Sequence, residues 1–382
     1  MSPTRVLPVA HTAERSTSLN QAAAPTDTEH RDVLVIAPQW VGDAIVALPL
    51  ISELARHHSA VDVLAVPAVS AVFECAPCVR RVITVPFAHG KLQWTLRRQT
   101  ARGLRGRYST AVILPNSLKA ALIPWLARIP LRRALTGEFP RRLLLTDARC
   151  PPTARAENVH RNSRVSMLDQ YLWLAPTPLP QASIDRYGTH RPRMTLPDNV
   201  SLDGDFPNAP AHSKDPGLLA LCPGAEYGPA KQWPAEHFAA VANAWCAQSH
   251  HHRVVLIGGP KETGIAAEIA GQCARPEQVI SMAGKTTLLQ AFAWIARAGA
   301  AVSNDSGLMH AAAALDVPVI GVFGSSDPLH TPPLHPRARA LSLSLPCSPC
   351  FQRTCPLGTT ACLRDLSAEQ VITALRAQAA PA

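Results

Sequence analysis

The chain has 382 residues, of which 47% are hydrophobic and 17% are charged, and its formal net charge is +10. This length suffices for two domains, and the composition is that of a soluble globular protein with large cores. The positive charge indicates an acidic partner such as a nucleic acid, an anionic membrane surface or a phosphorylated substrate. Nucleic acid fits least, because the sequence contains no recognition helix and no aromatic-basic repeat.

Much of the positive charge lies in two arginine-rich stretches, residues 97–107 and 128–142. A solvent-exposed helix face is the simpler explanation for any single arginine there. Together the two stretches predict a basic rim in the first half of the chain. The most apolar windows are short and are interrupted by Pro124, Arg128 and Pro130, which excludes a transmembrane span there. We expect a cytoplasmic protein that meets a membrane only peripherally.

Residues 1–31 lack the pattern of a secretory signal and are expected to form a disordered extension. Beyond them, short apolar runs alternate with helical patterns. The runs fall at 32–38, 61–67, 81–86 and 110–115, and again at 218–225, 254–259, 279–284, 300–305 and 317–324. Continuous apolar strands between helices are typical of parallel sheets that are covered on both faces.

The sequence therefore predicts an α/β protein with two doubly wound, Rossmann-like domains that face a central cleft. The expected boundaries are 32–205 for the first domain with its linker, 206–345 for the second domain, and 346–382 for a Cys-rich loop and a closing helix. Val371, Ile372 and Leu375 lie at helical spacing in that last segment.

Polar residues follow the predicted strands of the first half. Trp40, Gly42 and Asp43 come after the first strand. Asp43 is either a carboxylate that the helix dipole favours or a general base facing the cleft. Asn116, Ser117 and Lys119 follow the fourth strand. They are either helix caps or the polar floor of a site for a hydroxylated, charged molecule.

The second half carries a different set. In "VSNDSGLMHAAAAL" (302–315), Asp305, Ser306 and Gly307 begin a helix that also contains His310. Such a helix N-terminus can bind a phosphate, although Asp305 or Ser306 could simply be an N-cap. In "CPGAEYGPAKQWP" (222–234), Lys231 could neutralise that phosphate or lie in solvent. The sequence has no dinucleotide-binding or Walker motif, which disfavours a dehydrogenase or a nucleoside triphosphatase.

Four of the ten cysteines are close in sequence: Cys347, Cys350, Cys355 and Cys362. Such a group can hold zinc or an iron–sulfur cluster. The spacing of the second pair is loose for a zinc ribbon, so we expect a compact loop of thiols and no metal.

The segments 36–50, 112–138, 222–234, 256–262 and 302–333 resemble, in order and spacing, the ADP-heptose:lipopolysaccharide heptosyltransferases of glycosyltransferase family 9, which have the GT-B architecture. The Asp-Ser-Gly turn resembles the corresponding turn of members that add the second heptose more than that of members that add the first. The resemblance implies inverting transfer of L-glycero-D-manno-heptose from ADP-heptose to heptosyl-Kdo2-lipid A. The reaction would take place at the cytoplasmic face of the inner membrane of a Gram-negative bacterium.

The resemblance also implies roles. Asp43 would be the base and Lys231 a phosphate-binding catalytic residue, and His310 would help to stabilise the departing diphosphate. The donor would be bound by Gly224, Ala225, Glu226, Lys231, Asp305, Ser306, Gly307, Leu308 and His310. The acceptor would be bound by Trp40, Gly42, Asn116, Ser117, Lys119, Arg132 and Arg133. No metal is required in this scheme, and Mg²⁺ would at most stimulate.

Two alternatives stay open. One is a family relative that uses ADP-heptose with a different acceptor. The other is a catalytically silent scaffold that binds a sugar nucleotide or an anionic lipid. The joint presence of Asp43, Lys231 and His310 disfavours the silent scaffold.

Overall fold

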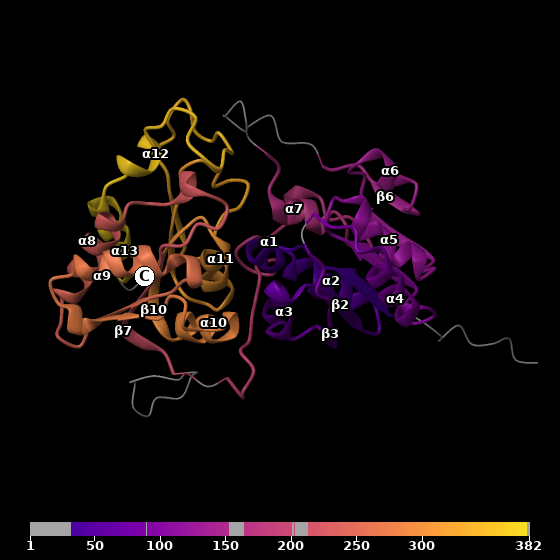
Figure 1. The fold of residues 1–382 in the computed structure, drawn as a ribbon, viewed down its shortest axis with the longest axis horizontal. Helices are drawn as coiled ribbons and strands as arrows, with labels where there is room; N and C mark the ends of the chain where they lie inside the picture. Colours follow the sequence, from indigo (N-terminus) through magenta and orange to yellow (C-terminus); the bar gives the residue numbers. More distant parts are fainter. Residues whose placement is uncertain (1–31, 89, 153–163, 201, 203–212, 380–382) are drawn as a thin grey trace, which may run out of the picture.

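The computed structural model describes residues 32–379, except 89, 153–163, 201 and 203–212. The extension expected over residues 1–31 lies outside the described residues. Figure 1 shows two α/β domains side by side, the N-terminal one in indigo and magenta and the C-terminal one in orange and yellow.

The N-terminal domain is built on a parallel sheet, which has six strands in the described residues, in the order β3-β2-β1-β4-β5-β6. These are β1 (Val33–Ile36), β2 (Val61–Ala65), β3 (Arg81–Thr84), β4 (Thr110–Ile113), β5 (Leu131–Leu135) and β6 (Asp147–Arg149). The helices are α1 (Val41–Val46), α2 (Leu48–His57), α3 (Pro67–Glu74), α4 (Trp94–Leu104), α5 (Leu118–Leu126), α6 (Phe139–Arg142) and α7 (Met167–Leu172), and a 3₁₀ turn, η1, follows at Gln181–Ser183.

The C-terminal domain repeats this plan, with six parallel strands in its described part, in the order β12-β11-β10-β7-β8-β9. These are β7 (Asp215–Cys222), β8 (Arg253–Leu256), β9 (Val279–Ser281), β10 (Ala298–Asn304), β11 (Val319–Val322) and β12 (Arg339–Leu341). The helices are α8 (Ala235–Cys246), α9 (Thr263–Gly271), α10 (Leu288–Arg297), α11 (Gly307–Ala314), α12 (Ala361–Arg364) and α13 (Ala368–Ala379), with 3₁₀ turns η2 (Pro229–Lys231), η3 (Pro260–Glu262) and η4 (Pro276–Gln278).

The central strands are apolar throughout because each one feeds two cores. Successive side chains of a strand point to opposite faces. Val33 and Val35 of β1 therefore enter one cluster, whereas Leu34 and Ile36 enter another. The predicted pair of doubly wound parallel sheets is confirmed. The expected boundary at 205/206 falls within residues 203–212, which are not described.

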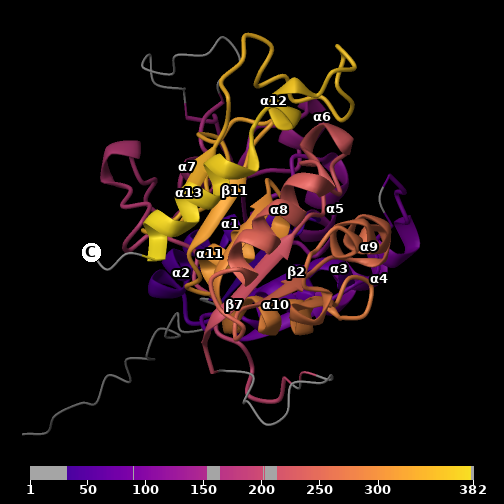
Figure 2. The ribbon, with the colours of Figure 1, turned by 90° about the vertical axis from the view of Figure 1, so that its left-hand side faces the viewer.

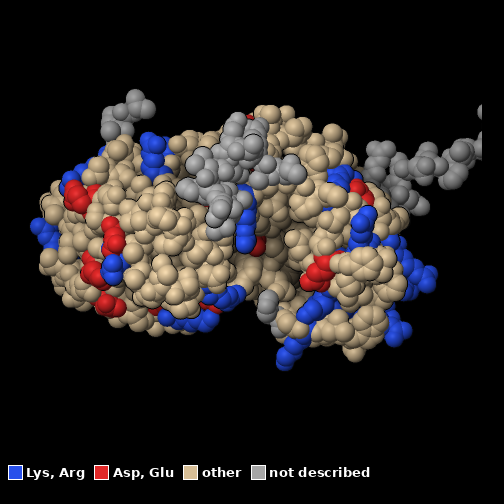
Figure 3. Space-filling view, turned by 90° about the horizontal axis from the view of Figure 1, so that it is seen from above, with Lys and Arg blue, Asp and Glu red and all other residues tan. Residues whose placement is uncertain are grey.

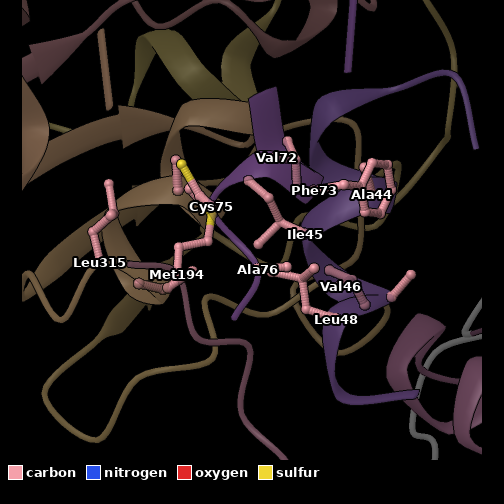
Figure 4. Close-up of a cluster of buried hydrophobic side chains, with 14 of the residues drawn as sticks. Ala44, Ile45, Val46, Leu48, Val72, Phe73, Cys75, Ala76, Met194 and Leu315 are labelled. Atoms are coloured by element: carbon pink, nitrogen blue, oxygen red, sulfur yellow. The ribbon is translucent and has the colours of Figure 1, made fainter. Parts of the chain in front are cut away.

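The cluster on the inner face of the first sheet continues into the second domain. Figure 4 shows Ile45 and Cys75 of the N-terminal domain in one group with Met194 of the linker and Leu315, which follows α11. The linker also binds both domains through its backbone. Met194 N–H donates to Ala314 O (2.9 Å) and Thr195 N–H to Cys75 O (2.8 Å). Packing across the join therefore fixes which ends of the two sheets face each other.

The C-terminal helix closes the second domain, as the sequence predicts. Val371, Ile372 and Leu375 of α13 lie in the same apolar cluster as Phe238 and Val241 of α8. Figure 2, which views the molecule from the C-terminal domain, shows α8, α9 and α13 on the outer side of this domain. The opposite side carries α10 and α11, which contact α3 and α1.

Candidate functional site

Asn304 is the last residue of β10, and its buried side chain binds backbone groups of the loop that follows β7. Its Oδ1 accepts from Trp233 N–H (3.1 Å), and its Nδ2 donates to Pro223 O (2.7 Å). These bonds join the loop that carries Lys231 to the start of α11. Ser306 occupies the N-cap position of α11 but makes no side-chain capping bond. The first amides of this helix are therefore oriented towards the cleft without a capping side chain, as an anion site requires.

Lys231 is fixed beside this helix start by a buried carboxylate. Its Nζ lies 2.5 Å from Asp305 Oδ2, and the same oxygen accepts from Ser326 Oγ at 2.5 Å. Asp305 is 5% exposed. Because a lysine side chain has many rotamers, this pairing confines its charge to one place before any ligand binds.

The first residues of α1 and α11 are in contact at the interface between the two domains. Two glycines make this contact possible. A Cβ on Gly307 would lie 2.8 Å from Val41 Cβ and 3.2 Å from Gly42 N. A Cβ on Gly42 would lie 3.1 Å from His310 Cδ2. Only glycine permits such a close approach of backbone. The donor-side helix and the carboxylate-bearing turn of α1 are thus brought into contact.

Asp43, in the first turn of α1, faces the charges of the other domain. Burial in the cleft raises the pKa of Asp43 to about 6, with Lys231 lowering it and Asp305 raising it. Near neutral pH the carboxylate is therefore ionised but holds a proton more readily than an exposed aspartate. Those are the properties of a general base.

A cavity of about 390 Å³ opens beside Asp43 in the N-terminal domain. It lies at the carboxyl ends of β1 and β4 and is closed on one side by α7. Of the side chains predicted to bind an acceptor, Trp40, Asn116, Ser117 and Lys119 line it. Gly42 lies next to it at the join, against His310. Asp43 lies between this cavity and the N-terminus of α11.

The wall opposite Asp43 is cationic. It contains Arg97, Lys119 and Lys91, and Asp43 is the acidic residue among the described lining residues. Arg97 is 5% exposed; its Nε donates to Leu92 O (2.6 Å), its Nη1 donates to Lys119 O (2.8 Å), and its guanidinium lies 4.4 Å from the centre of the Phe87 ring. Burial lowers the pKa of Arg97. No carboxylate in the described part of the chain pairs with it, so a ligand anion would complete its surroundings.

Arg132 and Arg133, expected to bind the acceptor, make contacts within the chain and away from the cavity. Arg133 Nε pairs with Asp147 Oδ2 (2.6 Å), and Arg132 Nε donates to Leu144 O (2.7 Å). Neither residue lines the cavity. Both belong to β5, and their guanidinium groups hold neighbouring strand and loop segments together.

His310, expected to help stabilise the diphosphate, lies against Gly42 of α1. The imidazole is buried, and desolvation lowers the pKa of His310 to about 4, despite the nearby Asp305. His310 is therefore neutral near pH 7. It can offer an N–H to a ligand but not a charge.

The other donor-side residues are more spread out. Gly224 and Ala225 follow β7, and a Cβ on Gly224 would lie 3.1 Å from the Glu262 side chain. Glu226 is exposed and pairs with Lys261 at 2.6 Å. Leu308 packs partly buried against the cluster that spans both domains. Glu226 therefore belongs to the rim of the cleft and not to the group around Lys231.

Three further residues complete the site and were not among those expected to bind the donor or the acceptor. Ser326 binds Asp305, Tyr171 lines the cavity on α7, and Arg97 forms its cationic wall. Ser326 lies in a Ser/Asp-rich turn after a strand, a recognisable signal that turn chemistry alone also explains. Arg97 belongs to the arginine-rich stretch 97–107, but nothing in that pattern separates it from the neighbouring arginines, and Tyr171 has the pattern of an ordinary helix residue.

The Cys-rich loop supports the segment that carries Lys231. Ala230 N–H donates to Arg353 O (3.1 Å), Tyr227 OH to Phe351 O (2.8 Å), and Phe351 N–H to Ser325 O (2.7 Å). All ten cysteines are free thiols. Among the residues that the structure describes, no three His, Cys, Asp or Glu side chains are grouped as a metal site. Within that same part of the chain, no helix is long and apolar enough to cross a membrane.

Known proteins resemble this chain in sequence over most of its length. The model of the family described as Glycosyltransferase family 9 (heptosyltransferase) matches residues 97–361. Lipopolysaccharide heptosyltransferase 2 of Escherichia coli is 36% identical over 320 residues, which cover 81% of this chain and 88% of that protein. Lipooligosaccharide heptosyltransferase 2 of Haemophilus influenzae is 34% identical over 322 residues, which cover 82% and 88%.

Solved structures agree with the sequence relatives. The structure of E. coli ADP-heptose lps heptosyltransferase II matches with a TM-score of 0.72 at 30% identity, covering 91% of this chain and 98% of that one. E. coli heptosyltransferase WaaC with ADP matches with a TM-score of 0.66 at 19% identity, covering 91% and 100%, which supports the fold alone.

Proposed function

Because the chain belongs to glycosyltransferase family 9, the heptosyltransferases, we propose that it transfers L-glycero-D-manno-heptose from ADP-heptose to the first heptose of the lipopolysaccharide inner core. The observation that carries this proposal is the meeting of Asp43 with Lys231 and the α11 N-terminus at one border. A base for an acceptor hydroxyl faces a cationic site for a departing diphosphate.

The reaction is a single displacement at the anomeric carbon. Asp43 takes the proton of the acceptor hydroxyl, whose oxygen forms the new glycosidic bond while the bond to the ADP oxygen breaks. Negative charge builds on the diphosphate as it leaves. The α11 amides and Lys231 stabilise that charge, because they are oriented before the reaction begins. Attack from the side opposite the leaving group inverts the anomeric centre.

In this scheme His310 stabilises the diphosphate without carrying a charge. As a neutral imidazole between α1 and α11 it donates an N–H to the bound sugar diphosphate, while Lys231 supplies the positive charge. We also propose that turnover needs no metal, with Mg²⁺ at most stimulating. Lys231 and the helix N-terminus provide the field that a cation would otherwise supply. Unchanged turnover after treatment with EDTA is the expected result, and loss that added Mg²⁺ restores would contradict it.

The acceptor occupies the cavity beside Asp43. Arg97 and Lys119 meet an acidic group of the acceptor, which fits heptosyl-Kdo2-lipid A because its sugars and lipid carry carboxylates and phosphates. Since that acceptor is a glycolipid, the enzyme works as a peripheral protein at the cytoplasmic face of the inner membrane.

The direct test is a coupled assay of ADP release with ADP-heptose and heptosyl-Kdo2-lipid A, with wild type and Asp43→Asn run in parallel. We expect that wild type releases ADP only when the acceptor is present and that Asp43→Asn releases none. Wild type that binds ADP-heptose but releases no ADP with this acceptor would contradict the proposed acceptor. Equal release of ADP by wild type and the variant would show that Asp43 is not the base.

A further inference from the structure

The outer end of the N-terminal domain exposes apolar side chains beside the acceptor cavity. Leu92 and Trp94, at the start of α4, are 48% and 45% exposed. Phe139 and Leu143, at α6, are 78% and 74% exposed. Large apolar residues with this much exposure, grouped on neighbouring elements, are typical of an interaction surface.

These residues lie on elements that contact the cavity-lining start of α5. The start of α5 lines the cavity with Ser117 and Lys119. Arg97 of α4 donates to Lys119 O (2.8 Å), and Arg141 of α6 donates to Asn116 Oδ1 (3.2 Å). Both helices are therefore attached to the same end of α5. Figure 1 shows α4, α5 and α6 together at the edge of the molecule farthest from the C-terminal domain.

Each of the two helices presents arginine on the face that carries its apolar residues. On α4, Arg98 and Arg102 follow Trp94 at intervals of four, whereas Arg97, Ala101 and Leu104 are buried. On α6, Arg142 lies next to Leu143 and three residues after Phe139, while Arg141 is buried. We call the seven exposed residues the α4–α6 face: Leu92, Trp94, Arg98, Arg102, Phe139, Arg142 and Leu143.

The charge of the α4–α6 face is not neutralised within the chain. In the described residues, no carboxylate forms an ion pair with Arg98, Arg102 or Arg142. Glu138, the nearby acidic residue, is directed to the Leu118 amide (3.5 Å). Figure 3 shows blue Lys and Arg side chains around the outer end of the N-terminal domain, at the right of the view.

We propose that the α4–α6 face docks on an anionic lipid bilayer, with Trp94, Phe139, Leu92 and Leu143 entering the headgroup region and the arginines binding lipid phosphates. Aromatic residues favour that interface, and each basic residue near an anionic membrane surface adds to binding. Docking there turns the cavity mouth towards the membrane. This proposal rests on the proposed function only for its purpose, which is access to a glycolipid acceptor.

The test measures cosedimentation of the full chain with vesicles that contain no acceptor. Vesicles of phosphatidylcholine with phosphatidylglycerol should bind the protein, and phosphatidylcholine alone should bind it poorly. Two variants probe the face, Trp94→Ala/Phe139→Ala and Arg98→Glu/Arg102→Glu/Arg142→Glu. The matched control is Leu357→Ala/Arg339→Glu, which alters one exposed apolar and one exposed basic residue of the C-terminal part.

Each variant of the α4–α6 face should lose at least about tenfold in apparent partitioning, and the control should keep it. Added salt should weaken binding of wild type. Equal binding by all proteins, or binding indifferent to lipid charge, would overturn the proposal. Size-exclusion chromatography with light scattering provides another check. If wild type were a dimer and Trp94→Ala/Phe139→Ala a monomer, the face would join two copies of the chain and the proposal would be overturned.

A second readout separates this proposal from the proposed function. With a deacylated, water-soluble acceptor, the face variants should transfer heptose as wild type does. With acceptor embedded in vesicles, they should lose activity through a higher acceptor KM. Loss of activity on the soluble acceptor as well would place these residues in the active site and contradict a docking role. Absence of transfer by wild type on either acceptor would refute the proposed function but leave the vesicle result intact.

Discussion

Lys231 and Asp305 form an ion pair on one domain, with 2.5 Å between Nζ and Oδ2, and both act on Asp43 of the other domain. Lys231 lowers the pKa of Asp43 and Asp305 raises it, while burial raises it most. The proton affinity of the base thus depends on a charge pair that lies across the cleft. This arrangement links the state of the donor site to the readiness of the acceptor side.

The first prediction concerns the acid limb of the pH profile. Since the pKa of Asp43 is about 6, kcat/KM should fall as the pH drops through that value and the base becomes protonated. Lys231→Met should move this limb to higher pH, because a cation that favours the carboxylate is lost. Asp305→Asn should move it to lower pH. Lys261→Met, on the cleft rim, is the control and should not move it.

The two opposite shifts are the decisive feature of this experiment. Lys231→Met should also reduce kcat by about 100- to 1000-fold, as expected for removal of one charge-stabilising group. The residual activity suffices for a pH profile. If both variants shifted the limb in the same direction, the titrating group would not be Asp43.

The second prediction concerns the contact between α1 and α11. Gly307→Ala places a methyl group 2.8 Å from Val41 Cβ, so the two helix starts must separate. We expect kcat/KM to fall by at least about tenfold, because small misplacement of reacting groups is costly. Gly264→Ala is the matched control: it lies in α9 with no atom within 4 Å of the new Cβ, and it should be neutral or slightly stabilising. Similar losses in both variants would show that the effect is not local to the contact.

Much of the fold could be predicted because its signals are local. The strands are continuous apolar runs, and the polar residues that follow them include Asp43, Asp305 and Lys231. The errors concern tertiary surroundings. Like Arg97, Arg132 and Arg133 lie in arginine-rich stretches. Only the packed structure shows that their guanidinium groups bind Asp147 and a backbone carbonyl.

His310 illustrates the same limit. The sequence shows that it follows the Asp-Ser-Gly turn, yet its charge depends on burial where α11 meets α1. Those helices come from regions more than 250 residues apart in sequence. No local pattern can report how much water such a contact excludes, and desolvation decides the protonation state.

The third prediction follows from that protonation state. The pKa of His310 is about 4 in the folded protein and 6.5 when it is unperturbed. Between these values the unfolded chain binds a proton that the folded one does not, so His310 costs stability as the pH falls from 6.5 to 4. The lost stability amounts to about 3 kcal/mol at the acid end.

Urea unfolding at several pH values measures this effect. His310→Gln should show a shallower loss of unfolding free energy between pH 6.5 and 4 than wild type. His57→Gln, at the exposed end of α2, serves as the control and should follow wild type. A His310→Gln curve parallel to that of wild type would mean that folding does not lower the pKa of this imidazole.

The fourth prediction is that the acceptor contacts cations that line the cavity and not the arginines of β5. Lys119→Gln and Arg97→Gln each remove a cation that faces the cavity, whereas Arg132→Gln removes one that binds backbone carbonyls outside it. A hydrogen bond to a charged group contributes about 1.5–3 kcal/mol, so the acceptor KM should rise about 10- to 100-fold in the first two variants. The KM for ADP-heptose should stay within about twofold, because the donor site lies on the other domain.

Steady-state kinetics with each substrate varied in turn separates these outcomes, and thermal unfolding identifies damage to the fold. Arg97 also holds Leu92 and Lys119 through their carbonyls, so Arg97→Gln alone could lose activity by loosening α4. Lys119→Gln has less of that complication, because its Nζ donates to a single backbone carbonyl, Gly90 O (2.6 Å). If Lys119→Gln raised both KM values equally, or Arg132→Gln matched it, the anionic group of the acceptor would have to bind elsewhere.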